Sequence, residues 1–181
     1  MATPPYLPSI LLDAVITALA GFIQPFVGAV YDPVAVTGIP IIRGQQNRVP
    51  PPVTAFVKLQ ELLESDIETP IFTNSSDPAV QLATITTPTR LDVQVDFYGP
   101  SAGDWCKGIK AVYRSPYAPD QFPSGIAPLY CSDGHQIPLV TGEEQYENHW
   151  ALTASLQYNP DVIVPQQSAT VLAVNTFEDL P

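Results

Sequence analysis

Three residue types used in nucleophilic catalysis stand close together in the C-terminal half of the chain: Cys131, Asp133 and His135. A thiol, an imidazole base and an orienting carboxylate can form a catalytic triad. The members of such triads normally meet through the fold rather than on one tight turn. The Asp133-Gly134 pair also has a structural explanation, because Asp-Gly favours the turn of a β-hairpin. We therefore expect no catalytic residues here, and a small hydrolase that uses Cys131 or the segment at Glu143 stays the alternative.

Acidic side chains form two further groups. Glu143, Glu144 and Glu147 stand beside Tyr146 and His149. Paired carboxylates can act as acid and base or bind a divalent cation, but an acidic loop facing solvent explains the group more simply. The same holds for a second acidic run, whose members are Glu61, Glu64, Asp66 and Glu68. Because the sequence contains no glycine-rich phosphate loop, paired-cysteine metal motif or nucleophile elbow, we expect no cofactor and no metal site.

Basic residues are few and are confined to one part of the chain. All seven Lys and Arg lie between Arg43 and Arg114, whereas the chain from Ser115 onward carries eight Asp and Glu, and the net charge is −11. Such a surface repels nucleic acid rather than binding it. Lys107, Lys110 and Arg114 are spaced to share one stripe of a helix. The stripe predicts a contact with the acidic C-terminal third of a neighbouring copy, and a helix face exposed to solvent is the alternative.

The composition indicates one domain with extended segments. A chain of 181 residues can bury about 70% of its unfolded surface without a disulfide or metal. Pro occurs 21 times, and only 14% of residues are charged. Since helix interiors and central strands reject Pro, these residues predict loops, sheet edges and arms. Cys106 and Cys131 are too few for a disulfide framework, so both are expected to be reduced thiols.

The first predicted element is an N-terminal helix. Ser9 is placed to cap its free amides, and apolar residues recur at helical spacing until Gly21 and Pro25 end or kink the helix. The apolar stretch 10–31 approaches the length of a membrane span, but polar residues interrupt it and no basic residue flanks it. We therefore expect a buried helix, and a membrane anchor stays the alternative. The absence of a basic region before the stretch also argues against a secretory signal peptide.

Beyond this helix the chain is expected to continue as a Pro-rich arm and then an α+β unit. The helix and arm make up residues 1–52, and the α+β part residues 53–181, together as one structural unit. Alternating apolar and polar residues predict strands at 53–60, 90–98 and 149–158, and a terminal strand is expected at 170–176. The order of elements predicts an α+β fold with a mainly antiparallel sheet flanked by two helices.

One helix and one hairpin complete the predicted fold. The helix covers residues 101–114, where Ser101 and Asp104 form a capping-box pattern at its start. The hairpin covers residues 128–140 and turns at the Asp-Gly pair. Because Pro cannot donate to a strand ladder, the Pro residues in this segment confine the hairpin to an edge of the sheet.

Strand 90–98 has a well-defined register. Its odd-numbered positions are apolar, whereas Asp92 and Asp96 lie on the opposite face. We expect that face to be exposed, so Asp96→Lys is predicted to weaken subunit contacts more than folding. Together with the helical stripe, the candidate subunit-contact residues are Asp92, Asp96, Glu143 and Glu144.

The end of this strand and the helix start that follows resemble a known family. The segment reads Asp92-Val93-Gln94-Val95-Asp96-Phe97-Tyr98-Gly99-Pro100, followed by Ser101-Ala102-Gly103-Asp104. A strand ending in Asp-Phe-Tyr-Gly-Pro before such a helix start resembles the neck and tail-terminator proteins of contractile-tailed phages. Further similar stretches lie at 128–130, 142–146 and 150–160, so the resemblance covers about residues 53–174.

The resemblance implies a structural virion protein that is assembled in the host cytoplasm and has no catalytic residues. It implies a homo-oligomeric ring, commonly a hexamer, that caps the tail tube and meets the head-side connector or stopper protein. Tail tube and sheath proteins would be its other neighbours, and DNA would pass through the lumen without sequence-specific binding. The low basic content agrees with an acidic channel, and the edge strands agree with contacts between subunits. The alternative within the virion is another head-tail connector, collar or minor tail protein.

Overall fold

The computed structural model describes residues 7–28, 39–44, 52, 54–75, 82–140 and 146–166. Within these residues, two α-helices and mostly antiparallel strands confirm the predicted α+β class. In chain order the elements are α1 (Leu12–Gly28), β1 (Ile41–Arg43), β2 (Phe56–Asp66), β3 (Ile71–Asn74), β4 (Leu82–Thr86), β5 (Thr89–Tyr98), α2 (Ala102–Tyr113), the 3₁₀ helix η1 (Pro119–Gln121), β6 (Ile126–Cys131), β7 (His135–Gln136), β8 (Leu139–Val140), β9 (Tyr146–Glu147), β10 (His149–Tyr158) and β11 (Asp161–Pro165).

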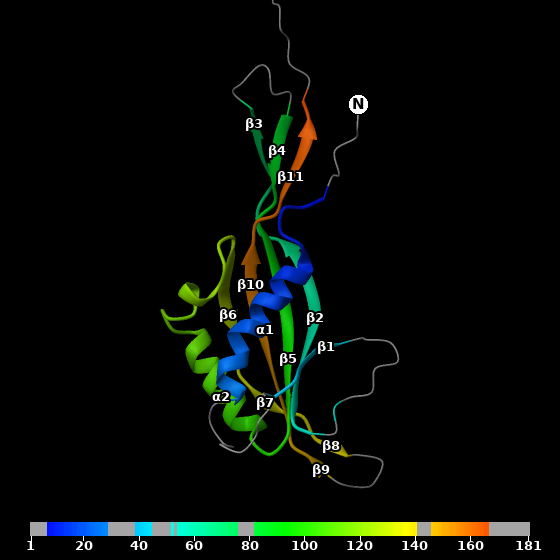
Figure 1. The fold of residues 1–181 in the computed structure, drawn as a ribbon, viewed down its shortest axis with the longest axis vertical. Helices are drawn as coiled ribbons and strands as arrows, with labels where there is room; N and C mark the ends of the chain where they lie inside the picture. Colours follow the sequence, from blue (N-terminus) through cyan, green and yellow to red (C-terminus); the bar gives the residue numbers. More distant parts are fainter. Residues whose placement is uncertain are drawn as a thin grey trace, which may run out of the picture.

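The main sheet has the strand order β1-β2-β5-β10-β6, and β7 also pairs with β10 (Figure 1). Its pairs are antiparallel except for β1 with β2. The predicted strands 90–98 and 149–158 appear as β5 and β10, whereas 53–60 appears within a longer β2. The predicted strand 170–176 lies outside the described residues. Part of the predicted Pro-rich arm is not a loop, because Ile41–Arg43 pairs with β2.

Both α-helices pack on one face of the main sheet (Figure 1). The helices pack on this face because the odd-numbered apolar side chains of β5 all point to it and are buried there. Phe22 of α1 stacks on Phe122, with ring centroids 5.2 Å apart, and meets the edge of Tyr113 at 5.6 Å. Each such buried side chain contributes about 1.5–3 kcal/mol. The predicted buried helix is confirmed, and it continues past Gly21 and Pro25 to Gly28.

No helix in the described ranges is long and apolar enough to cross a bilayer.

Two predicted helix caps are wrong. Helix α1 begins at Leu12, and Ser9 instead forms two hydrogen bonds with Asp161. The Ser9 N–H donates to the Asp161 carbonyl at 2.9 Å, and the Asp161 N–H donates to the Ser9 hydroxyl at 2.9 Å. Ser101 occupies the N-cap position of α2 but makes no side-chain cap hydrogen bond. The turn before α2 depends on Gly99 instead, whose φ of +120° is accessible to glycine.

The predicted hairpin at 128–140 is also wrong, although its place at a sheet edge is right. Strands β6 and β7 do not pair with each other, because both run antiparallel to β10. Ser132 bridges the interval: its N–H donates to the Thr153 carbonyl at 2.8 Å, and its hydroxyl accepts the Thr153 N–H at 2.8 Å. The Asp-Gly segment is therefore an interruption in one edge rather than a reversal of the chain.

A second sheet, which the sequence pattern did not predict, projects beyond the main sheet along the long axis of the molecule (Figure 1). It consists of β3, β4 and β11 in the order β11-β4-β3 and is called the outer sheet below. Each of its strands continues a strand of the main sheet after a short link, and each link contains a proline: Pro70, Pro88 and Pro160. Since proline removes a ladder donor, the prolines separate the two sheets at a common level.

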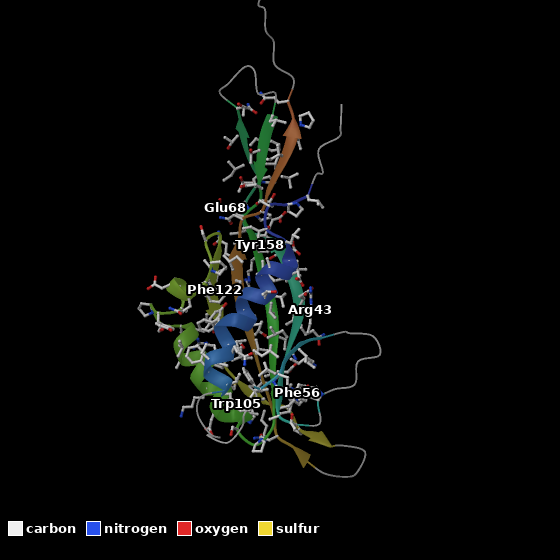
Figure 2. All side chains as sticks on the ribbon, in the orientation of Figure 1. Arg43, Phe56, Glu68, Trp105, Phe122 and Tyr158 are labelled. Atoms are coloured by element: carbon white, nitrogen blue, oxygen red, sulfur yellow. The ribbon has the colours of Figure 1, made fainter. Side chains whose placement is uncertain are left out.

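The junction between the sheets is held by polar contacts. Figure 2 shows Glu68 and Tyr158 at this level, and the Tyr158 hydroxyl donates to Glu64 Oε1 at 2.9 Å. The backbone N–H of Ile67 donates to the Pro88 carbonyl at 2.8 Å. The outer sheet is thus attached to the main sheet by more than the three covalent links.

Candidate functional site

Asp96 belongs to a buried polar cluster on the face of the main sheet opposite the helices. Its Oδ1 lies 3.0 Å from His149 Nε2 and accepts a hydrogen bond from Gln94 Nε2 at 2.7 Å. Its Oδ2 lies 3.1 Å from Lys58 Nζ. Asp96 is fully buried, so the expectation that it lies on an exposed face, available to a partner, is wrong.

Three stacked rings adjoin this cluster. The Tyr98 ring stacks between Phe56 and His149, at centroid distances of 4.3 and 4.2 Å. Lys58 lies opposite Asp96 in the β2–β5 register. Burial lowers the pKa of Lys58, but the hydrogen bond and charge attraction of Asp96 outweigh burial, so its pKa is raised. The cluster thus keeps Lys58 charged beside a buried carboxylate.

Asp92 is likewise engaged within the chain. It accepts a hydrogen bond from the Ser155 hydroxyl at 2.5 Å and from Arg90 Nη2 at 2.8 Å. Its side chain is mostly buried by these neighbours, whereas Arg90 is half exposed. Asp92 therefore offers a partner little free carboxylate surface.

Lys110 and Arg114 of the helical stripe contact β6 and the segment between β6 and β7. Lys110 Nζ lies 2.6 Å from Asp133 Oδ1, and Arg114 Nε donates to the Cys131 carbonyl at 2.9 Å. The Arg114 guanidinium also lies over the Tyr130 ring, 4.9 Å from its centroid. The hydrogen bond and charge of Lys110, together with the charge of Arg114, hold the pKa of Asp133 below its usual range.

A cleft of about 460 Å³ opens beside this stripe. It lies where α2 faces Gly134 and Trp150, and its lining combines two cations, one exposed carboxylate, and apolar and small residues: Gly103, Asp104, Cys106, Lys107, Lys110, Gly134 and Trp150. Lys107 is exposed at its rim, and Trp150 is partly buried.

One protein family matches most of the chain. The sequence model described as phage neck terminator protein matches residues 13–179, which begin within α1. The chain belongs to the phage neck terminator family. It is therefore a structural protein of the phage neck, and the predicted resemblance to phage terminators is confirmed. No curated protein matches this chain.

Cys131, Asp133 and His135 lack the features of an activated nucleophile. Cys131 and Cys106 are buried, and burial raises the pKa of each thiol to about 11. A catalytic cysteine needs the opposite shift, toward the thiolate. His135 lies on β7 and is exposed. Among the residues that the structure describes, no three His, Cys, Asp or Glu side chains gather as a metal site.

The acidic groups are distributed differently from the sequence expectation. Glu143 and Glu144 lie outside the described residues. The second acidic run begins within strand β2, where Glu61 pairs with Arg43, and Arg43 also lies 2.7 Å from Asp13 of α1. These contacts tie β1, β2 and α1 together, so part of the run has a structural role.

The partners of Asp96 could not be identified from the sequence pattern alone. Lys58 carries one usable signal, since it is a lone cation at an outward position of a predicted strand. His149 carries none, because its approach to Asp96 depends on the pairing of β5 with β10.

Proposed function

We propose that this chain forms a hexameric ring that caps the tail tube of a contractile-tailed phage and joins the tail to the head-side connector or stopper protein. Membership of the neck terminator family over residues 13–179 carries the proposal. Tail tube and sheath proteins are its proposed neighbours on the tail side. The free thiols Cys106 and Cys131 suit assembly in the reducing host cytoplasm.

The charge of the chain supports a role in a DNA conduit. A net charge of −11 with seven basic residues in 181 makes sequence-specific DNA binding unfavourable. An acidic wall repels phosphates and lets DNA slide without being held. Passage of DNA through the ring therefore requires no dedicated binding site.

The cleft beside α2 is proposed as one subunit contact. Asp133 occupies one side of Lys110, whereas Lys107 is exposed at the cleft rim. The acidic segment at Glu143 and Glu144 of a neighbouring copy has the charge to match Lys107. Such a contact between different surfaces of two copies is the kind that closes a ring.

Electron microscopy of phage particles lacking this gene, with and without complementation, tests the function. Overlong or unjoined tails beside filled heads, corrected by complementation, are the expected result. Tails of normal length that stay separate from heads would indicate a joining protein and would contradict tube capping. Normal tails joined to heads would refute both roles.

A further inference from the structure

The outer sheet exposes apolar side chains on both of its faces. In the β3-β4-β11 register, Phe72, Ile85 and Val162 form one apolar row, and Ile163 lies on the opposite face. Phe72 is 68% exposed and Ile163 49%. A single sheet without a second layer has no interior of its own, and no described helix packs on this one. A partner that covered these side chains would remove apolar surface from water, which favours docking.

The outer sheet is also nearly free of charge. Asp161 is the one charged residue among its strands as described, and its carboxylate accepts a hydrogen bond from the Thr86 hydroxyl at 2.5 Å. The whole chain carries a net charge of −11. Two copies repel each other through most acidic surfaces, but an uncharged surface brings no carboxylates together. Its neutrality therefore suits a partner that is itself acidic, as a second copy is.

A second apolar surface lies on β6, an edge strand of the main sheet. Strand β6 pairs with β10 alone and contains no charged residue. Leu129, the extra residue of a bulge against β10, is 48% exposed, and its neighbour Tyr130 is 55% exposed. Leu129 thus presents an apolar side chain beside an edge that has no further strand partner among the described residues. Next to it, the Tyr130 ring carries the Arg114 guanidinium 4.9 Å from its centroid.

We propose that the outer sheet of one copy docks on the β6 edge of a second copy, at Leu129 and Tyr130. The two surfaces differ, so the contact is directional and propagates from copy to copy. This inference rests on the proposed ring and names one surface that builds it.

The outer sheet offers a small contact area. Strands of four to five residues, spaced about 4.8 Å apart with a rise of about 3.3 Å per residue, give a face of roughly 10 by 16 Å. A stable interface buries about 800 Å² per partner. The docking is thus one part of a larger contact, and its test must not depend on a stable dimer in solution.

Photo-crosslinking in assembled particles tests the docking. The amino acid p-benzoylphenylalanine is placed at Phe72 in one sample and at Ile163 in another, which samples both faces. We expect a covalent dimer near twice the chain mass of 19.6 kDa from at least one position, with the crosslink in the peptide that contains Leu129 and Tyr130. The matched control is the same amino acid at Leu11, which is 51% exposed at the start of α1; it should yield no such dimer.

The outcomes separate the docking from the proposed function. Crosslinks only to other virion proteins, no crosslink from either position, or equal dimer from Leu11 would overturn the docking. If the docking fails while particles lacking the gene have overlong tails, the terminator role stands without it. If the dimer forms but those particles have normal, joined tails, the docking stands and the proposed function is refuted.

Discussion

Asp96 and His149 meet across two neighbouring strands, with Asp96 Oδ1 3.0 Å from His149 Nε2. Asp96 is fully buried, and its other oxygen lies 3.1 Å from Lys58 Nζ. A buried carboxylate depends on its partners, because removing one of them leaves a charge without compensation. The pairing therefore ties β2, β5 and β10 together through side chains as well as through the ladder.

Asp96→Asn should destabilise the fold by about 2–3 kcal/mol. This is below the roughly 3–5 kcal/mol of a fully buried pair, because Lys58 keeps some contact with water. Urea denaturation measures the change. The exposed Asp66 provides the control, since Asp66→Asn should change stability by less than about 0.5 kcal/mol. Equal stability of the two variants would show that the cluster contributes little.

Gly99→Ala should cost about 2 kcal/mol or more. Gly99 has φ +120°, and an added Cβ would lie 2.5 Å from the Ala55 Cβ, so both backbone strain and overlap oppose it. Gly108→Ala is the matched change within α2, where an added Cβ meets nothing within 4 Å. It should raise stability by up to about 1 kcal/mol. Thermal unfolding of both variants checks the difference, and a change of the same sign in both would contradict it.

The protein should lose stability as the pH rises from about 9 to 11. The folded state holds the Cys131 proton up to a pKa of about 11, whereas an ordinary thiol releases it near 9.0. Between these values the unfolded chain binds fewer protons, so this contribution is fully present below pH 9 and declines above it. In Cys131→Ala the free energy of unfolding should fall less steeply over this interval. Denaturant titrations from pH 8 to 11 measure the slope, and an unchanged slope would contradict the assignment.

Lys110→Glu should impair tail completion while leaving the denaturation midpoint almost unchanged. Lys110 pairs with Asp133 at the surface, and surface pairs contribute little to folding. Reversing its charge, however, opposes an acidic partner at the cleft. Complementation with this variant should give fewer joined particles than Asp133→Asn, which keeps Lys110 positive. Equal particle counts for the two variants would remove the cleft from the proposed contacts.

Some features followed directly from sequence pattern. The alternation in 90–98 and in 149–158 predicted β5 and β10, and helical spacing predicted α1 and α2, because in these segments one face is buried over a long run. The segment ending in Gly99 and Pro100 also supported the resemblance to phage terminators, which the family match confirmed. In a long amphipathic helix or strand the buried side chains recur at a fixed spacing, so a single sequence suffices to recognise the element.

Other features were decided only by tertiary contacts. The outer sheet joins strands from residues 71–74, 82–86 and 161–165, and these short strands carry no strong alternation of apolar and polar residues. Asp96 has the pattern of an exposed residue, yet Lys58 and His149 from neighbouring strands bury it. The Asp-Gly segment has the pattern of a hairpin, yet β10 offers both flanking strands a better partner. Each case depends on hydrogen bonds or charges between residues far apart in the chain, and these form only when the strands have paired.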